Sequence, residues 1–270
     1  MQNYFLGGNT CRGFYSFYDG FCAEKDDFLY IIKGGPGCGK SSLMKRVAQK
    51  WEQSGFAVER IFCSGDPDSL DGIYCPALHL GYADGTAPHR LDVRYMGVNG
   101  AYLDFSPFFR LDTLRQSREQ IRTLADACSQ EYQKAYTLLG TFAEPAQNSV
   151  KRASCFFRAV TCRGLISFYP ADVQTVSEKE LRLLLDAPCR VIAHPLFPDR
   201  IEGVFLKNTQ AVAFCRNEKA EDALLNAVSA VCPILSKAKS LHDELESLYR
   251  PHIDFARVDR LVKKHEQMQK

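Results

Sequence analysis

Apolar runs alternate with turn residues through the first part of the chain, which is the pattern of an α/β domain. An apolar run at 28–32 leads into a glycine-rich stretch, and the segment 41–51 beyond it carries apolar residues at helical spacing until Ser54-Gly55. Further apolar runs at 57–63 and 78–83 have the length and composition of strands. The pattern therefore predicts a sheet in which one strand is joined to a helix by a glycine-rich loop.

Residues 4–19 begin with a glycine-rich turn and continue as an aromatic segment of strand type. Two roles are open for the turn, because it can cover an edge of the sheet or approach a ligand. The residues concerned are Gly7, Gly8, Asn9 and Arg12.

Two later stretches have the spacing of long amphipathic helices. The second, 218–248, contains Pro233, which predicts a break or a kink. We expect these helices to pack within the protein or to meet a protein partner or a second copy of the chain. The first begins near Ser106, and its apolar stripe is Leu111, Leu114, Ile121, Leu124, Cys128, Tyr132 and Leu139.

The second half repeats parts of the first. Residues 161–169 match residues 10–18 at seven of nine positions, and 199–205 resemble 68–74 in their order of acidic, apolar and glycine residues. The second copy is 20 residues shorter between these matches, with only a helix, 178–186, and a strand, 190–193, where the first copy has its glycine-rich loop. We expect this copy to bind no nucleotide through such a loop and to complete or gate the first, with Arg163 acting in trans.

These patterns divide the chain into four parts, with the boundary between the halves at 141–149. We expect an α/β fold that combines a P-loop NTPase sheet flanked by helices, a degenerate second α/β half and long helical segments. The parts are a nucleotide-binding half at 1–104, a helical insertion at 105–150, the degenerate repeat at 151–217 and C-terminal helices at 218–270.

Composition excludes several classes of protein. A formal net charge of +2 over 270 residues offers no electrostatic basis for binding nucleic acid, and Lys263-Lys264 has the form of a solvated helix end. Neither a signal peptide nor an apolar stretch approaching 18 residues is evident, so we expect a cytoplasmic protein that does not enter a membrane. Eleven cysteines without a C-x-x-C pair are typical of reduced thiols.

The glycine-rich stretch at 34–41 satisfies the phosphate-loop (Walker A) pattern, with a strand before it and a helix after it. Its glycines let the backbone wrap around phosphate oxygens, to which the N–H groups and the helix dipole are attracted. Lys40 is expected to reach the β- and γ-phosphates and the Ser41 hydroxyl to ligate Mg²⁺. The expected nucleotide contacts are Gly35, Pro36, Gly37, Cys38, Gly39, Lys40, Ser41 and Ser42.

Acidic residues follow the next two predicted strands, where the carboxyl ends of a sheet form a ligand crevice. Asp66 or Asp68 is a candidate for positioning water or an acceptor hydroxyl, although this Asp-Pro-Asp-Ser segment is equally good turn chemistry. Asp84 ends an apolar strand as a Walker B acid does, and it would hold Mg²⁺. His89, Arg90 and Arg94 follow as candidates for contact with the γ-phosphate.

Cys38 lies inside the glycine-rich loop. The loop N–H groups and the helix N-terminus are expected to favour its thiolate, so that oxidation would block nucleotide binding. The alternative is a small loop residue without redox chemistry.

Four segments together resemble a family of poorly characterised bacterial P-loop ATPases. They are Tyr-Phe-x-x-Gly-Asn-Thr at 4–10, Gly-Phe-Tyr-Ser-Phe-Tyr-Asp at 13–19, Lys-Gly-Gly-Pro-Gly-x-Gly-Lys-Ser-Ser at 33–42 and Asp-Gly-Thr-Ala-Pro-His at 84–89. The resemblance implies tandem nucleotide-binding halves, ATP binding and hydrolysis. This chain departs from it because its second half has no phosphate loop.

We therefore expect an ATPase that binds Mg-ATP and hydrolyses it to ADP and phosphate, coupled to a conformational change. Lys40, Asp66 and Asp84 are its expected catalytic residues, and Ser41 and Asp84 its metal ligands. A small-molecule kinase and a nucleotide-sensing module with little turnover remain as alternatives. The absence of an Asn/Thr-Lys-x-Asp guanine-reading pattern favours adenine.

Overall fold

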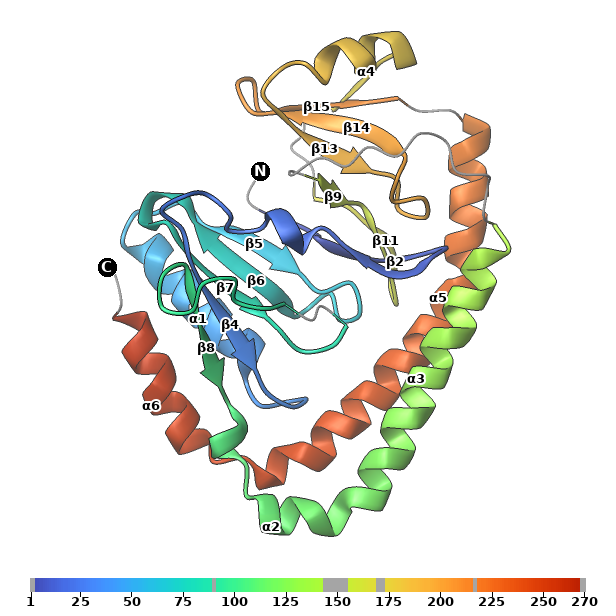
Figure 1. The fold of residues 1–270 in the computed structure, drawn as a ribbon. Helices are drawn as coiled ribbons and strands as arrows, with labels where there is room; N and C mark the ends of the chain where they lie inside the picture. The colour runs from blue at the N-terminus through green and yellow to red at the C-terminus, as the bar shows by residue number, and fades with distance from the viewer. Residues whose placement is uncertain (1–2, 89–90, 143–154, 169–172, 216–217, 268–270) are drawn as a thin grey trace.

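The computed structural model describes residues 3–88, 91–142, 155–168, 173–215 and 218–267. It is a mixed α/β protein with two mixed sheets and two short hairpins, flanked by helices. Figure 1 shows the two sheets as separate lobes, with a pair of long helices along one side of the molecule, of which one continues beside the second sheet.

The first sheet has six strands in the order β1-β5-β6-β7-β4-β8. β4 is parallel to its neighbours β7 and β8, whereas β6 is antiparallel to both β5 and β7. The predicted strands at 28–32, 57–63 and 78–83 are confirmed as β4, β5 and β7. The bounds are β1 Asn3–Tyr4, β4 Phe28–Lys33, β5 Glu59–Phe62, β6 Leu70–Cys75, β7 Leu80–Asp84 and β8 Gly100–Asp104.

The helix predicted after the glycine-rich stretch is confirmed as α1, Lys40–Gln53. Its apolar stripe is buried against the sheet, and full burial of a leucine, methionine or valine side chain stabilises the fold by about 1.5–3 kcal/mol. Gly55 has a φ of 87°, the left-handed conformation common just beyond a helix end. The buried residues of α1 are Leu43, Met44, Val47, Ala48 and Trp51.

The C-terminal helix α6, Phe255–Glu266, packs beside α1. Val258 and Val262 enter the same core as Trp51, while Arg46 of α1 donates hydrogen bonds to Asp259 (2.7 Å) and Glu266 (2.8 Å). The C-terminal segment therefore completes the layer of helices over the first sheet. Lys263 and Lys264 are exposed in its last turn, as expected of a solvated helix end.

The second sheet repeats the strand order of the first. Its five strands run β12-β15-β14-β13-β9, which places β9, β13, β14, β15 and β12 in the positions of β1, β5, β6, β7 and β4 with the same directions. Both sheets also carry an irregularity at the same point, between Ile61 and Phe62 and between Ile192 and Ala193. The bounds are β9 Cys155–Phe157, β12 Val173–Thr175, α4 Glu178–Leu184, β13 Cys189–Ala193, β14 Ile201–Leu206 and β15 Ala211–Phe214.

Where the first lobe has a glycine-rich loop, the second has only Val176 and Ser177. Ser177 caps α4 in a capping box with Glu180, so the chain passes directly from β12 into a short helix. Within the described residues of the second lobe, no strand occupies the position of β8.

Two hairpins lie between the lobes. Their turns are alike, because the hydroxyls of Thr10 and Thr161 donate to the carbonyls of Gly13 (2.8 Å) and Gly164 (3.0 Å). The glycine-rich turn near the N-terminus packs on the second hairpin, since Asn9 Nδ2 donates to the carbonyl of Val160 at 2.8 Å. The hairpin strands are β2 Gly7–Thr10, β3 Gly13–Ser16, β10 Ala159–Thr161 and β11 Gly164–Ile166.

An arginine in each hairpin forms an ion pair with an acid that belongs to the other copy of the repeat. Arg12 pairs with Asp199 of the second lobe, and Arg163 pairs with Asp68 of the first. The sequence repeat aligns Arg12 with Arg163 and Asp68 with Asp199, so the two ion pairs correspond. Arg163 thus contacts the first lobe through Asp68, within the same chain.

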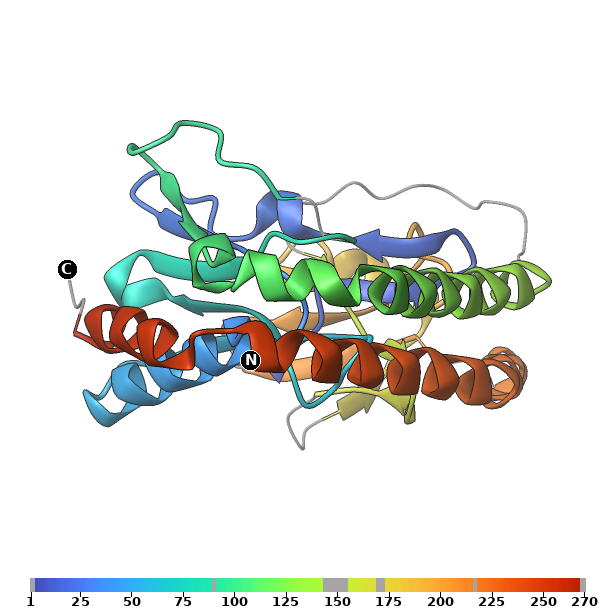
Figure 2. The same ribbon diagram turned by 90° about the horizontal axis from the view of Figure 1, so that it is seen from below.

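The two long helices form an antiparallel arm (Figure 2). They are α3, Arg118–Gly140, and α5, Glu218–Tyr249, preceded by the short α2, Leu111–Leu114. Of the break or kink expected from Pro233, the break does not occur, because α5 continues through this residue; Figure 1 shows the helix changing direction along its length. The predicted boundary at 141–149 lies outside the described residues from 143 onward. Short 3-10 helices are η1 Tyr18–Gly20, η2 Pro76–Leu78, η3 Ser106–Phe108, η4 Arg115–Ser117 and η5 Arg250–His252.

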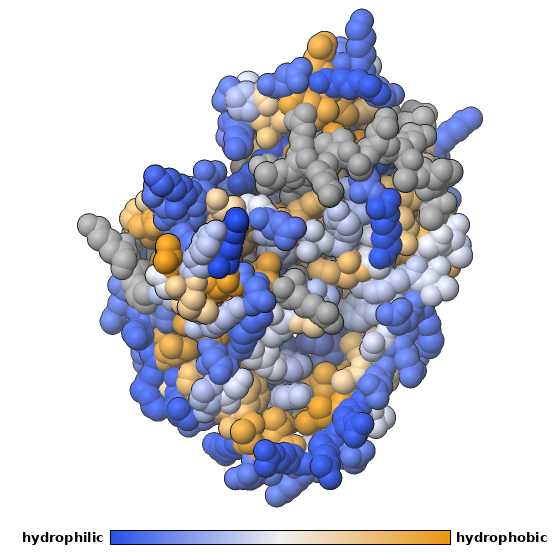
Figure 3. Space-filling model, in the orientation of Figure 1, coloured by the Kyte–Doolittle hydropathy of each residue, from blue (hydrophilic) through white to orange (hydrophobic). Residues whose placement is uncertain are grey.

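The face in Figure 3 is hydrophilic around its outer rim, and its apolar residues lie in several separate patches. In the described part of the chain, none of the helices combines the length and apolar character needed to cross a membrane. The cysteines whose side chains are described form no disulfide with one another, in keeping with the expected thiols.

Candidate functional site

The glycine-rich loop, Gly34–Gly39, joins β4 to α1. Gly37 and Gly39 have φ values of 65° and 98°, a region that glycine enters without steric cost. A Cβ at Gly34 would lie 2.7 Å from Cys38 Sγ and 2.9 Å from Phe105 Cβ, so the loop folds tightly on itself and on the residue after β8. These three glycines therefore each meet a steric requirement of the loop.

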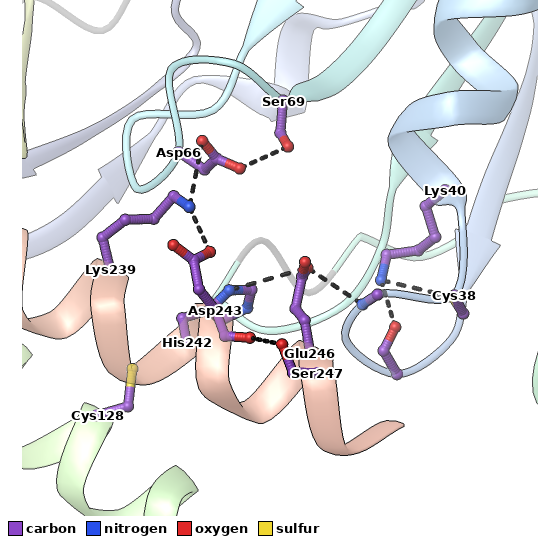
Figure 4. Close-up of polar contacts among 12 residues, drawn as sticks. Cys38, Lys40, Asp66, Ser69, Cys128, Lys239, His242, Asp243, Glu246 and Ser247 are labelled. Atoms are coloured by element: carbon purple, nitrogen blue, oxygen red, sulfur yellow. Dashed lines mark hydrogen bonds and ion pairs between the residues drawn. The ribbon is translucent and has the colours of Figure 1, made fainter. Parts of the chain in front are cut away.

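Lys40 is folded over this loop (Figure 4). Its ammonium Nζ donates to the carbonyls of Gly34 (3.2 Å) and Gly35 (3.0 Å) and lies 3.6 Å from Asp84 Oδ2. Its side chain is 12% exposed. The structure thus brings together the lysine and the acid that sequence reasoning assigned to one site.

Asp84 reaches the loop because β7 is the direct neighbour of β4, with Asp84 opposite Ile32 in the parallel register. Its Oδ1 accepts hydrogen bonds from the Thr86 backbone N–H (2.8 Å) and hydroxyl (2.6 Å), which fix the carboxylate and leave Oδ2 toward Lys40. Ser41 stands in the first turn of α1, and its hydroxyl accepts from the Leu70 N–H at 3.0 Å. A hydroxyl and a carboxylate are hard oxygen donors of the kind that Mg²⁺ prefers.

The two acids that follow β5, Asp66 and Asp68, lie in different surroundings. Asp66 accepts a hydrogen bond from the Ser69 hydroxyl at 2.8 Å and lies 3.7 Å from the Lys239 ammonium, on the side that faces α5. Asp68 is exposed and bound by Arg163, whose guanidinium lowers the pKa of this carboxyl. Asp68 is therefore a contact between the lobes, and Asp66 alone of this pair lies near the loop face of α5.

Cys38 is buried inside the loop, 1% exposed. Burial raises the pKa of its thiol, and the neighbouring Lys40 ammonium opposes that rise only in part. The expectation of a thiolate here is wrong, because removal from water outweighs the attraction of the positive charge.

The loop beyond β7 contributes less than expected within the described residues. Arg94 is exposed and its guanidinium carbon lies 5.2 Å from the centre of the Tyr95 ring. His89 and Arg90 lie outside the described residues.

Sequence reasoning missed α5 as a wall of this site. The Gly37 N–H donates to Glu246 Oε1 at 3.1 Å, and the ring of Tyr249 lies 3.2 Å from where a Cβ on Gly35 would be. Upstream on the same face of the helix, Lys239, His242 and Asp243 extend from Glu246 toward Asp66 (Figure 4). Lys239, His242 and Asp243 precede Glu246 by seven, four and three positions, and this spacing indicates one polar helical face in the sequence.

Comparison with protein-family models, with curated proteins and with solved structures finds no match to this chain.

Proposed function

We propose that this protein binds Mg-ATP at the Gly34–Gly39 loop and hydrolyses it to ADP and phosphate. The observation that carries the proposal is the placement of Lys40 Nζ between the loop carbonyls and Asp84, at the N-terminus of a 14-residue helix. That combination of backbone N–H groups, helix dipole and ammonium group suits the β- and γ-phosphates. In this proposal Ser41 and Asp84 would hold Mg²⁺, which supplies charge neutralisation on the phosphates.

Asp66 is proposed to position the attacking water or an acceptor. It lies across from the loop with its carboxylate fixed by Ser69 and Lys239, so it has an orientation suited to accept a proton or a hydrogen bond. An acceptor that is a small molecule would make the protein a kinase.

The test is phosphate release from Mg-ATP by the wild type and by Lys40→Ala, together with binding of a non-hydrolysable ATP analogue to both. Lys50→Ala is a matched control, because Lys50 is an exposed lysine farther along the same helix, outside the loop. Release and binding that both depend on Lys40 would support the ATPase. Binding that does not depend on Lys40 would contradict the assignment of the loop as the site.

A nucleotide-sensing module is the second candidate, and it is favoured by the contact of Glu246 with the loop. It predicts Lys40-dependent binding of the analogue with phosphate release near background. A kinase would differ from both, because its ATP consumption would rise in proportion to an added acceptor.

A further inference from the structure

A carboxylate lies where the Gly34–Gly39 loop would receive a phosphate. Glu246 Oε1 accepts the Gly37 N–H at 3.1 Å, across 209 residues of sequence. An N–H group makes one well-aligned hydrogen bond at a time. A phosphate oxygen and the Glu246 carboxylate therefore cannot both accept from the Gly37 N–H in good geometry. The loop is thus already bound by an anion that belongs to the chain itself.

The backbone of α5 lies as close to the loop as the Glu246 side chain does. A Cβ on Gly37 would lie 3.2 Å from both Cβ and the carbonyl oxygen of Glu246, and on Gly35 it would meet Tyr249 and Phe109 at 3.2 and 3.3 Å. These contacts leave the turn of α5 around Glu246 seated directly on the loop. A phosphate seated on this part of the loop would therefore have to displace this turn of α5 as well as the Glu246 side chain.

We propose that Glu246 is an internal competitor of the nucleotide, and that binding of the triphosphate displaces the C-terminal turns of α5 from the loop. The inference rests on the proposed nucleotide site. If only a minor fraction of the molecules is in the form that can bind the nucleotide, the apparent affinity for the nucleotide falls in proportion to that fraction. The negative charge strengthens the closed form, since hydrogen bonds to ionised acceptors are about twice as strong as neutral ones.

α5 would carry this displacement to the second lobe. Near its beginning, Glu221 accepts hydrogen bonds from Arg158, which also binds Glu202 of β14 in the second sheet. Toward its end, Lys239 faces Asp66 and Glu246 holds the loop. One helix therefore contacts both lobes, so a change at the loop has a continuous path to the sheet that lacks a phosphate loop of its own.

The experiment compares binding of the Mg²⁺ complex of a non-hydrolysable ATP analogue to the wild type, Glu246→Gln, Glu246→Ala and Glu244→Gln. Glu244 is an exposed acid on the same helix and serves as the matched control. We expect Glu246→Ala to bind roughly tenfold more tightly than the wild type. Glu246→Gln should lie between them, because its amide oxygen still accepts from Gly37 without the charge, and Glu244→Gln should equal the wild type.

Amide hydrogen exchange supplies a readout that a purely structural role would leave unchanged. On adding the analogue to the wild type, exchange should speed up in 244–254 and slow down at the start of α1. Lys40-dependent binding that is unchanged or weaker in Glu246→Ala would overturn this inference and leave the proposed nucleotide site standing. No binding by any variant would overturn both.

Discussion

Glu59 and Arg190 occupy the same position in corresponding strands of the two sheets, and they pair with each other. Arg190 Nη2 donates to both carboxylate oxygens of Glu59, at 2.7 and 2.9 Å, and Tyr4 donates its hydroxyl to the same carboxylate at 2.5 Å. The side chains of Glu59 and Arg190 are only 16% and 22% exposed. The repeat therefore contributes the two members of one ion pair, one from each copy, at the junction of the lobes.

Removing either partner leaves a charge largely shielded from water, so Glu59→Met or Arg190→Met should each destabilise the protein by about 2–3 kcal/mol. The double variant should lose less than the sum, because two apolar side chains of similar length replace both charges. Urea unfolding of the four proteins measures this coupling. Additive losses would mean that the pair does not join the lobes energetically.

Two buried histidines make stability depend on pH. His265 lies 2.9 Å from the Tyr82 hydroxyl, and burial with the nearby Lys264 lowers its pKa to about 4; burial likewise lowers the pKa of His194 to about 3. In the unfolded chain a histidine takes up a proton near pH 6.5, whereas in the folded protein these two stay neutral until the pH is lower. Their contribution to the free energy of unfolding is therefore complete above pH 6.5 and is lost as the pH falls toward 4. The largest slope from each is about 1.4 kcal/mol per pH unit.

The free energy of unfolding, measured in urea between pH 7.5 and 5, should therefore fall with decreasing pH. His265→Gln should reduce that fall by roughly half, since His194 supplies the remainder. If the variant shows the same slope as the wild type, His265 is protonated in the folded protein and the burial argument fails.

Gly34 has no room for a side chain. An added Cβ would meet Cys38 Sγ at 2.7 Å and Phe105 Cβ at 2.9 Å, so Gly34→Ala should destabilise the protein by about 1–3 kcal/mol and weaken nucleotide binding. Removing the sulfur in Gly34→Ala/Cys38→Ala should restore part of the stability. Gly140→Ala, whose Cβ would meet only the Cys11 carbonyl at 3.8 Å, is the control and should be tolerated. Thermal unfolding and analogue binding read out all three, and equal effects of both glycine substitutions would refute the steric argument.

The loop and Asp84 could be predicted from sequence because both depend on local order. A glycine-rich stretch between a strand and a helix specifies its own backbone, and an acid at the end of a parallel strand falls at the same edge of the sheet. β6 was missed because Asp71 and Gly72 interrupt its apolar pattern, although both are buried in the structure. The position of β6 between β5 and β7 is set by strand pairing in the folded protein, which the local sequence pattern does not show.

Glu246 could not be placed in the same way. Its contact with Gly37 depends on the length and direction of α5, which follow from the packing of that helix on α3 and on the second lobe. The sequence shows only that Lys239, His242, Asp243 and Glu246 share a helical face, and a polar face is most often simply solvated. Cys38 was misjudged for a related reason, since its burial depends on contact with parts of the chain beyond the loop.

Asp84 and Asp104 provide a matched pair of acids, because they end the two strands that flank β4. Asp84 lies 3.6 Å from Lys40, whereas Asp104 is exposed and accepts from the Ser106 N–H at 2.8 Å. Asp84→Asn retains an oxygen for Thr86 but removes the charge proposed to hold Mg²⁺, so phosphate release should fall roughly 100-fold. Asp104→Asn should release phosphate like the wild type. Titration of Mg²⁺ completes the test, because the Asp84 variant should require a higher Mg²⁺ concentration for half-maximal release. Equal Mg²⁺ requirements in both variants would remove Asp84 from the proposed metal site.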